Sequence, residues 1–149
     1  MSKNKTPRVD PRVQAKSLSD KVPKGQPPEK GSFDHYRPVI CLSHVDRDGP
    51  FSWKGIRSRE LHLVVNKLHG YFANTWQQLL YQNEHYFHAI ETSRLSRPAR
   101  ERLIALRLEE LDVVYDVRIT KPIRIWLARL DHYAFPLWWD PKHLVYPTK

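Results

Sequence analysis

The C-terminal third of the chain alternates between apolar and other side chains as β-strands do. From residue 113 to 119, apolar side chains stand at every second position, which is the period of a half-buried strand. The same alternation returns over 123–128, after the strand-breaking triplet 120–122, and a third apolar run spans 133–139, after a turn at 131–132. These runs predict a meander of three antiparallel strands joined by tight turns.

The two faces of the predicted meander differ in chemistry. One face is aliphatic and needs a core, whereas the other carries Arg118, Arg124 and Trp126. If 120–122 is a three-residue hairpin loop, Arg118 lies directly opposite Arg124, and like charges in that position are destabilising. A phosphate or carboxylate between them would offset that cost, which predicts an anion site. Two solvated arginines, one arginine paired with Asp116, or a register shifted by one residue remain alternatives.

Helical periodicity precedes the meander. Apolar residues at i, i+3 and i+4 spacing predict a helix over 58–80, with its first residue as N-cap and Trp76 in the stripe that faces the core. A second helix is predicted over 96–111, with a serine as N-cap and Pro98 in its first turn. Both helices need a sheet to cover, because neither can bury its apolar stripe alone.

The order of these elements predicts the fold class. Residues 38–45 are typical of a first strand, and 81–94 allow no firm assignment. Helices followed by a run of strands indicate an α+β fold. We expect two helices packed on one face of a small, mostly antiparallel sheet, in the order strand-helix-helix-three-strand meander. The other face of the sheet is expected to stay partly open.

The first part of the chain differs from the rest. Residues 1–32 hold eight Lys and Arg against three Asp and Glu, five of the twelve prolines, and no aromatic residue. Such a composition cannot bury enough apolar surface to order itself, so 1–34 are predicted to be a disordered, basic, proline-rich tail and 35–149 one folded domain. The tail is either a basic arm that contacts phosphate backbones or a solubilising segment.

The charge balance points to anionic partners. The chain has 25 Lys and Arg against 16 Asp and Glu, a formal net charge of +9. This favours nucleic acid, the ribosome or an acidic protein, although solubility alone is an alternative. The single cysteine, Cys41, excludes an internal disulfide and is expected to be a buried, inert thiol. With no apolar run of about 20 residues and no secretory signal, we expect a cytoplasmic protein that does not contact a membrane.

Histidines and tryptophans supply further candidate site residues. His143, close after the third strand, is the best-placed histidine for acid–base chemistry, with a local turn histidine as the alternative. Trp138 and Trp139 should lie on opposite faces, one in the core and the other available to stack on a base. Pairs of histidines at helical spacing supply too few ligands for zinc, so no metal and no cofactor are expected.

Three segments together resemble a known family. They are YDVRI at 115–119, IRIW at 123–126 and FPLWWDPKH at 135–143, and they are similar to the closing module of the RelE/ParE-like toxin superfamily. Small bacterial and phage proteins of unknown function end in a similar Trp-Asp-Pro-x-His segment. The resemblance covers 95–147 well and 38–80 only in topology. The chain departs from the family in its greater length, its tail and its Trp-rich terminal strands.

The resemblance implies an activity and roles for individual residues. RelE-type members cleave mRNA in the ribosomal A site by activating the ribose 2′-hydroxyl, whereas ParE-like members poison gyrase. By resemblance, Arg124 stabilises the transition state, Arg118 orients the nucleophile, and His143 or Tyr146 donates the proton. The residues expected to contact nucleic acid are Lys121, Trp126, Trp138 and Lys142.

Two classes of function remain as expectations. The first is a RelE-like toxin that acts as a ribosome-associated mRNA endoribonuclease without a metal ion, with an acidic antitoxin as a further partner. The second is a non-catalytic module that binds nucleic acid or protein. The two differ in geometry, since an enzyme requires Arg118, Arg124 and His143 or Tyr146 to converge on one open face.

Overall fold

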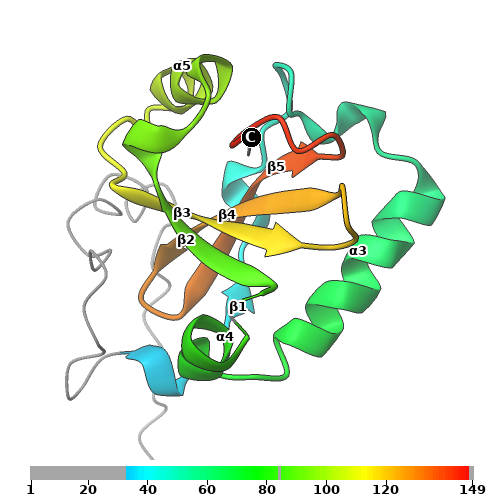
Figure 1. Ribbon diagram of the computed structural model, residues 1–149, viewed down its shortest axis with the longest axis vertical. Coiled ribbons are helices and arrows are strands. Elements are labelled where there is room, and N and C mark those ends of the chain that lie inside the picture. The colour runs from blue at the N-terminus through cyan, green and yellow to red at the C-terminus, as the bar shows by residue number, and fades with distance from the viewer. Residues whose placement is uncertain (1–32, 84, 148–149) are drawn as a thin grey trace, which may run out of the picture.

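A five-stranded mixed sheet forms the centre of the fold. The computed structural model describes residues 33–83 and 85–147, and their architecture is α+β (Figure 1). The strand order is β1-β5-β4-β3-β2. The strands are β1 (Val39–Ile40), β2 (Phe87–Glu91), β3 (Val113–Arg118), β4 (Arg124–Leu130) and β5 (Tyr133–Asp140).

Three α-helices and four short 3₁₀ helices surround the sheet in the described part of the chain. The α-helices are α3 (Ser58–Tyr71), α4 (Trp76–Gln82) and α5 (Arg97–Ala105). None of the helices in this part is long and apolar enough to cross a membrane. The 3₁₀ helices are η1 (Phe33–His35), η2 (Leu42–His44), η3 (Trp53–Gly55) and η4 (Thr92–Arg94).

The structure confirms the meander and its register. Strands β3, β4 and β5 pair antiparallel in sequence order, and Arg118 lies directly opposite Arg124. A β-bulge shifts the register of β4 against β5 after Trp126, whose partner is Trp138, while the next residue of β4 pairs with Pro136. Proline has no amide hydrogen to donate, so a bulge is one of the few places where a central strand tolerates it.

Other predicted elements differ from the structure. The helix predicted over 58–80 is two helices, because Thr75 caps a new helix: its hydroxyl accepts a hydrogen bond from the amide of Gln78, whose side chain bonds back to the Thr75 amide. The second helix begins after Ser96 as predicted but ends at Ala105 rather than near residue 111. The first strand keeps only two residues and pairs parallel with β5.

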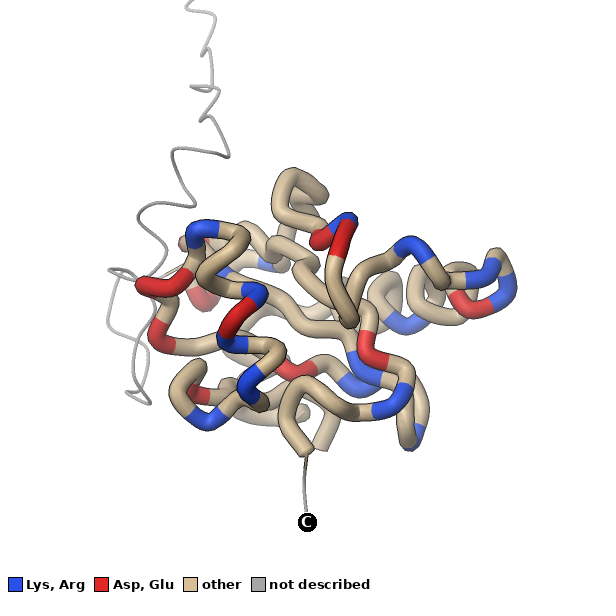
Figure 2. The backbone as a smooth tube through the Cα atoms, turned by 90° about the horizontal axis from the view of Figure 1, so that it is seen from above, with Lys and Arg blue, Asp and Glu red and all other residues tan. Residues whose placement is uncertain are grey.

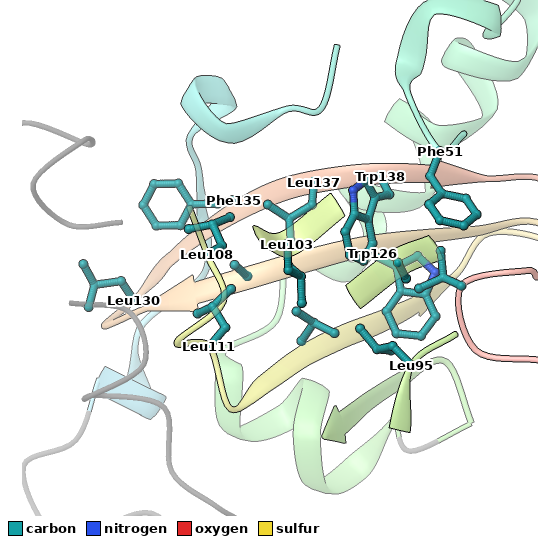
Figure 3. Close-up of a cluster of buried hydrophobic side chains, with 14 residues drawn as sticks. Phe51, Leu95, Leu103, Leu108, Leu111, Trp126, Leu130, Phe135, Leu137 and Trp138 are labelled. Carbon is teal, nitrogen blue, oxygen red and sulfur yellow. The ribbon is translucent and has the colours of Figure 1, made fainter. Parts of the chain in front are cut away.

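Helices cover both faces of the sheet, so the expectation of one partly open face is wrong. Helices α3 and α4 pack on one face, and α5 packs on the other (Figure 1). The α5 face is closed by side chains of α5 and its neighbouring loops, which meet Trp126 and Trp138 of the sheet (Figure 3). Strand β2, which the sequence left unassigned, extends the sheet beyond β3 and ends in an unpaired edge.

Buried ion pairs attach the outer segments to the sheet. The Asp46 carboxylate, 1% exposed, accepts two hydrogen bonds from Arg102 of α5 and one from the Trp138 indole, at 2.8–3.1 Å. Gly49 has a φ of 83° beside this pair, and a Cβ there would lie 2.5 Å from the Arg102 Nε atom. The loop before α3 and helix α5 are therefore held in one arrangement.

Two residues that the sequence assigned to the tail belong to the described fold. Phe33 and Asp34, assigned to the tail, belong to η1, and the buried Asp34 carboxylate pairs with Arg129 of β4. The predicted disorder of residues 1–32 lies outside the described residues. Figure 2 shows Lys and Arg positions in all parts of the described fold, interleaved with Asp and Glu positions, rather than in one stripe.

Trp76 is buried as predicted, and we expect Trp76→Ala to lower the free energy of unfolding by about 3–5 kcal/mol. The ring is 0% exposed, stacks beneath the Arg129 guanidinium and donates a hydrogen bond to the His132 carbonyl. Leu61→Ala is the control, because Leu61 of the same predicted stripe is 44% exposed, and its loss should change stability by about 0.5 kcal/mol or less. Chemical denaturation measures both, and equal losses would contradict the placement of Trp76.

Candidate active site

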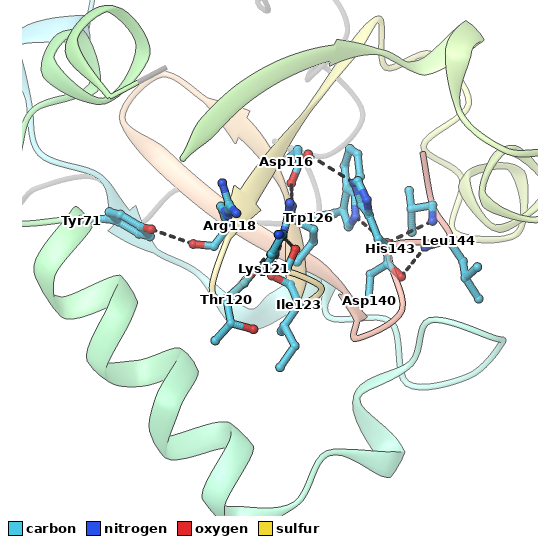
Figure 4. A network of polar contacts seen from close by, with 12 residues as sticks. Tyr71, Asp116, Arg118, Thr120, Lys121, Ile123, Trp126, Asp140, His143 and Leu144 are labelled. Carbon is cyan, nitrogen blue, oxygen red and sulfur yellow. Dashed lines mark hydrogen bonds and ion pairs between the residues drawn. The ribbon is translucent and has the colours of Figure 1, made fainter. Parts of the chain in front are cut away.

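Four polar side chains gather at the end of the sheet where β3 stops and β4 starts. Asp116 and Arg118 come from β3, Arg124 from β4, and His143 from the turn after β5 (Figure 4). We refer to these four residues as the Asp116 cluster. Three of them are among the residues that the sequence assigned to catalysis, and Asp116 was named only as a partner for an arginine.

Arg124 is the structural member of the cluster. Its Nη1 atom donates to the carbonyl oxygens of Thr120, Lys121 and Ile123 at 2.7, 2.8 and 3.2 Å, which closes the β3–β4 turn. Its Nε atom lies 3.3 Å from the Asp116 carboxylate, and the side chain is only 12% exposed. Two of its three nitrogens thus face groups inside the fold and little of the side chain reaches solvent, which does not favour the transition-state role predicted for Arg124.

Arg118 faces Arg124 across the hairpin, but its side chain is not held by hydrogen bonds as that of Arg124 is. Its side chain is partly exposed and makes no ion pair or hydrogen bond with any residue of the described ranges. Its backbone is held firmly, because its amide donates to the Tyr86 carbonyl and its own carbonyl accepts a 2.6 Å bond from the Tyr71 hydroxyl. Arg118 therefore presents, from a rigid position, a cation that has no partner among residues 33–83 and 85–147.

Asp116 is a buried carboxyl whose environment does not favour its charge. Burial raises its pKa from 3.8 to about 6, and the charge of Asp140 adds to the rise, whereas Arg124 and Arg118 oppose it. The Arg124 ion pair lacks the alignment of a hydrogen bond, so the Oδ1 atom has no hydrogen-bond partner. A buried carboxyl with a raised pKa and an unsatisfied oxygen is typical of a functional site.

His143 is aimed at Asp116 by its backbone. It adopts a φ of 57°, a left-handed conformation that costs a residue with a Cβ roughly 1 kcal/mol. The Asp140 carboxylate holds the turn in place by accepting bonds from the amides of Leu144 and Val145 at 2.8 and 3.0 Å. The His143 Nε2 atom then lies 3.9 Å from Asp116 Oδ2, and burial together with Arg124 lowers the His143 pKa below 6.5.

The remaining predicted site residues divide into two groups. Lys121 and Lys142 are exposed next to Arg124 and His143, where they are free to contact phosphates. Tyr146 lies elsewhere, because its hydroxyl and ring both contact the Arg94 guanidinium. The nucleic-acid contact expected of Trp126 and Trp138 does not fit the structure, since both rings are fully buried and their indole N–H groups bond to carboxylates inside the fold.

The sequence assigned no site role to the two carboxyls that organise the site. It did offer Asp116 as a partner for an arginine, and the structure confirms that pair with Arg124. Asp116 stands within a predicted strand and Asp140 directly follows another, and an aspartate in a buried strand is itself a signal, because it needs a partner. Trp138 and Trp139 do lie on opposite faces, but both are in the core. Cys41 is only partly buried, so its predicted full burial is wrong.

We expect the two opposed arginines to respond differently to substitution. Arg124→Ala should lower the free energy of unfolding by about 3 kcal/mol, because it opens the β3–β4 turn and leaves the buried Asp116 charge unpaired. Arg118→Ala should change stability by about 0.5 kcal/mol or less, or stabilise the hairpin by removing a like charge. Urea denaturation of both variants measures the difference, and similar losses would contradict the division between them.

Asp116→Asn should stabilise the chain at pH 7.5 by roughly 3 kcal/mol, at about 1.36 kcal/mol per unit of pKa. The carboxyl binds its proton more tightly in the folded chain, with a pKa of about 6, than in the unfolded chain, with 3.8. Folding stability therefore falls as pH rises through that window, and asparagine removes the loss. At pH 3.5 the gain should vanish. Melting temperatures at both pH values test this, and a gain that is equal at both would refute it.

The cluster thus combines an unpaired guanidinium, a partly exposed imidazole and a buried carboxyl behind it. Arg118 is placed to bind an anion at the end of β3, and His143, with 22% of its side chain exposed, is placed to exchange a proton next to Asp116. Among the described ranges, no three metal-binding side chains come together. Comparisons of the chain with protein-family models, curated proteins and solved structures find no match.

Proposed function

We propose that this chain cleaves RNA by proton transfer alone, through attack of a ribose 2′-hydroxyl on the adjacent phosphodiester. The observation that carries the proposal is the Asp116–His143 pair, 3.9 Å apart, next to the unpaired guanidinium of Arg118. This reaction needs a base such as a neutral imidazole, a carboxylate that stabilises the protonated base, and a cation on the phosphate. The Asp116 cluster contains one side chain suited to each requirement.

The proton transfers follow from the directions of the two pKa shifts. His143, whose pKa is lowered, is neutral at pH 7 and accepts the proton of the 2′-hydroxyl. The freed oxygen forms a bond to phosphorus, the bond to the 5′-oxygen breaks, and that oxygen takes a proton from water. The hydroxide so formed takes the proton from His143, which returns the imidazole to its neutral form. The products are a 2′,3′-cyclic phosphate and a 5′-hydroxyl. Asp116, ionised above a pKa of about 6 and 3.9 Å from the ring nitrogen, stabilises the imidazolium through its charge.

Arg118 supplies the electrostatic part of the reaction. Its guanidinium would hold the non-bridging oxygens of the phosphate, whose negative charge grows in the transition state. Lys121 and Lys142 are exposed on either side of the cluster and would contact neighbouring phosphates. Arg124 acts indirectly, because it closes the turn between the two strands that carry Asp116 and Arg118.

The resemblance of the last third of the chain to RelE-type toxins suggests the substrate. Those proteins cleave mRNA on the ribosome, so we propose ribosome-bound mRNA as the RNA that is cut. The net charge of +9 supports a partner rich in phosphate. In the same proposal, an acidic antitoxin protein restrains the activity in the cytoplasm.

A second candidate is a module that binds nucleic acid and cuts no bond. Two observations favour it. Helices cover both faces of the sheet, so the described residues do not form the open face expected of an enzyme. The Asp116 side chain is 9% exposed, whereas its imidazole neighbour is 22% exposed. In that case Arg118, Lys121 and Lys142 would form a phosphate-binding edge, and the raised pKa of Asp116 would be a by-product of burial. This module would bind RNA with the same arginine but leave the strand intact.

The proposed activity is tested with end-labelled single-stranded RNA and with mRNA bound to ribosomes, in EDTA, between pH 5 and 8. We expect cyclic phosphate ends and a rate that falls as pH drops through about 6, because the Asp116 carboxyl gains its proton there, and His143, whose pKa is lowered, gains its own as the pH falls below 6.5. Arg118→Ala should lower the rate by about 100-fold or more. His143→Asn should do the same.

Arg100→Ala is the matched control, since Arg100 is exposed on α5 and its loss removes one positive charge away from the cluster. It should keep the wild-type rate, and all variants should keep the wild-type melting temperature within about 2 °C. If the wild-type chain leaves both RNA substrates intact while binding them, the binding module is the correct function. If Arg100→Ala and Arg118→Ala lose the same activity, the site lies elsewhere.

A further inference from the structure

An exposed aromatic ring stands beside the unpaired arginine of the cluster. Tyr86 immediately precedes β2, and 45% of it is exposed. Its carbonyl accepts the amide hydrogen of Arg118 at 2.9 Å, so the two residues are neighbours across the β2–β3 pair. Two directly neighbouring residues at one end of the sheet therefore carry an exposed aromatic ring and a guanidinium with no partner among the described residues.

The Tyr86 ring is supported from behind rather than left loose. Its centroid lies 6.2 Å from that of Tyr71 at an angle of 31°, and the His85 ring packs edge-on at 6.5 Å. The Tyr71 hydroxyl in turn donates to the carbonyl of Arg118. One aromatic pair therefore braces both the exposed ring and the backbone of the arginine, which lowers the entropy lost when a ligand binds there.

Tyr86 and Arg118 suit the base and the phosphate of a nucleotide, respectively. Every base offers a flat π face, and stacking on an aromatic side chain is the common way to hold a single strand without reading its sequence. The phosphate that follows the base needs a cation, and Arg118 has no partner in the described ranges that would compete for it. A double strand does not fit, because its bases are already stacked on one another.

We propose that Tyr86 and Arg118 form a subsite that binds one nucleotide of a single-stranded RNA, with the base stacked on Tyr86 and the phosphate on Arg118. The subsite rests on the proposed RNA cleavage and extends it, because it places the strand across the Asp116 cluster. Tyr86 acts in positioning rather than in chemistry. It makes unpaired RNA the preferred substrate and tolerates any base.

The test measures binding separately from cleavage. A fluorescent single-stranded RNA with 2′-O-methyl groups cannot be cut by 2′-hydroxyl attack, and its dissociation constant for the full chain is measured by polarisation at several salt concentrations. Tyr86→Ala should raise the Kd about 5- to 100-fold, the effect of one lost stacking contact. Tyr86→Trp should keep the wild-type Kd. Arg118→Ala should raise the Kd and reduce the salt dependence by about one counterion.

Tyr81→Ala is the matched control, because Tyr81 of α4 has the same exposed fraction, 45%, and lies at another end of the sheet. It should bind as the wild type does. A strand with abasic sites gives a second control, on which Tyr86→Ala should have no effect. Melting temperatures of both tyrosine variants show that the fold is retained.

The outcomes separate the subsite from the catalytic proposal. If Tyr86→Ala and Tyr81→Ala bind the RNA with the same Kd, the subsite is overturned whether or not the chain cuts RNA. The same holds if Tyr86→Ala weakens binding of the abasic strand as much as binding of the complete strand. Absence of any binding by the wild type overturns it as well. If binding depends on Tyr86 and Arg118 but unmodified RNA stays intact, the subsite stands and the proposed cleavage fails.

Discussion

Buried carboxylates hold this fold together, because a charge removed from water must find donors. Asp34 attaches η1 to Arg129 of the sheet. Asp46 joins the loop before α3 to α5 and to the indole of β5. Asp140 attaches the C-terminal turn to β4 through an indole and two amides. Three segments outside the strands are thus each held by one carboxylate that bonds to a side chain of the sheet.

Asp116 is the exception among the buried carboxylates. Its charged neighbours are one poorly aligned arginine and one imidazole at 3.9 Å. Burial therefore raises its pKa to about 6, whereas a full set of hydrogen-bond donors would have kept the pKa low. Such a group weakens the fold at neutral pH. Proteins retain unfavourable groups of this kind where they serve a purpose, and here the carboxyl stands behind a partly exposed histidine and next to an unpaired arginine.

The local parts of the fold could be predicted from the sequence, and the long-range parts could not. Alternating side chains and short turns determine β3, β4 and β5 and even the pairing of Arg118 with Arg124, since a tight turn sets the register of its own hairpin. Strand β2 could not be recognised in the sequence, because its buried and exposed residues do not alternate cleanly. The break between α3 and α4 could not be recognised in the sequence either. The helical spacing of apolar residues continues across it, although Thr75 forms a capping box there.

The sequence by itself determined the identity of the candidate residues, through their charge and their positions in recognisable strands. Only the tertiary structure decided what each one does. Arg118 and Arg124 are equivalent by pattern, but the carbonyls of the β3–β4 turn occupy Arg124 and leave Arg118 unpaired. The indoles of β4 and β5 look available in the sequence, yet α5 covers them. The physical reason is that burial and hydrogen-bond partners come from segments distant in the chain, which a local pattern does not contain.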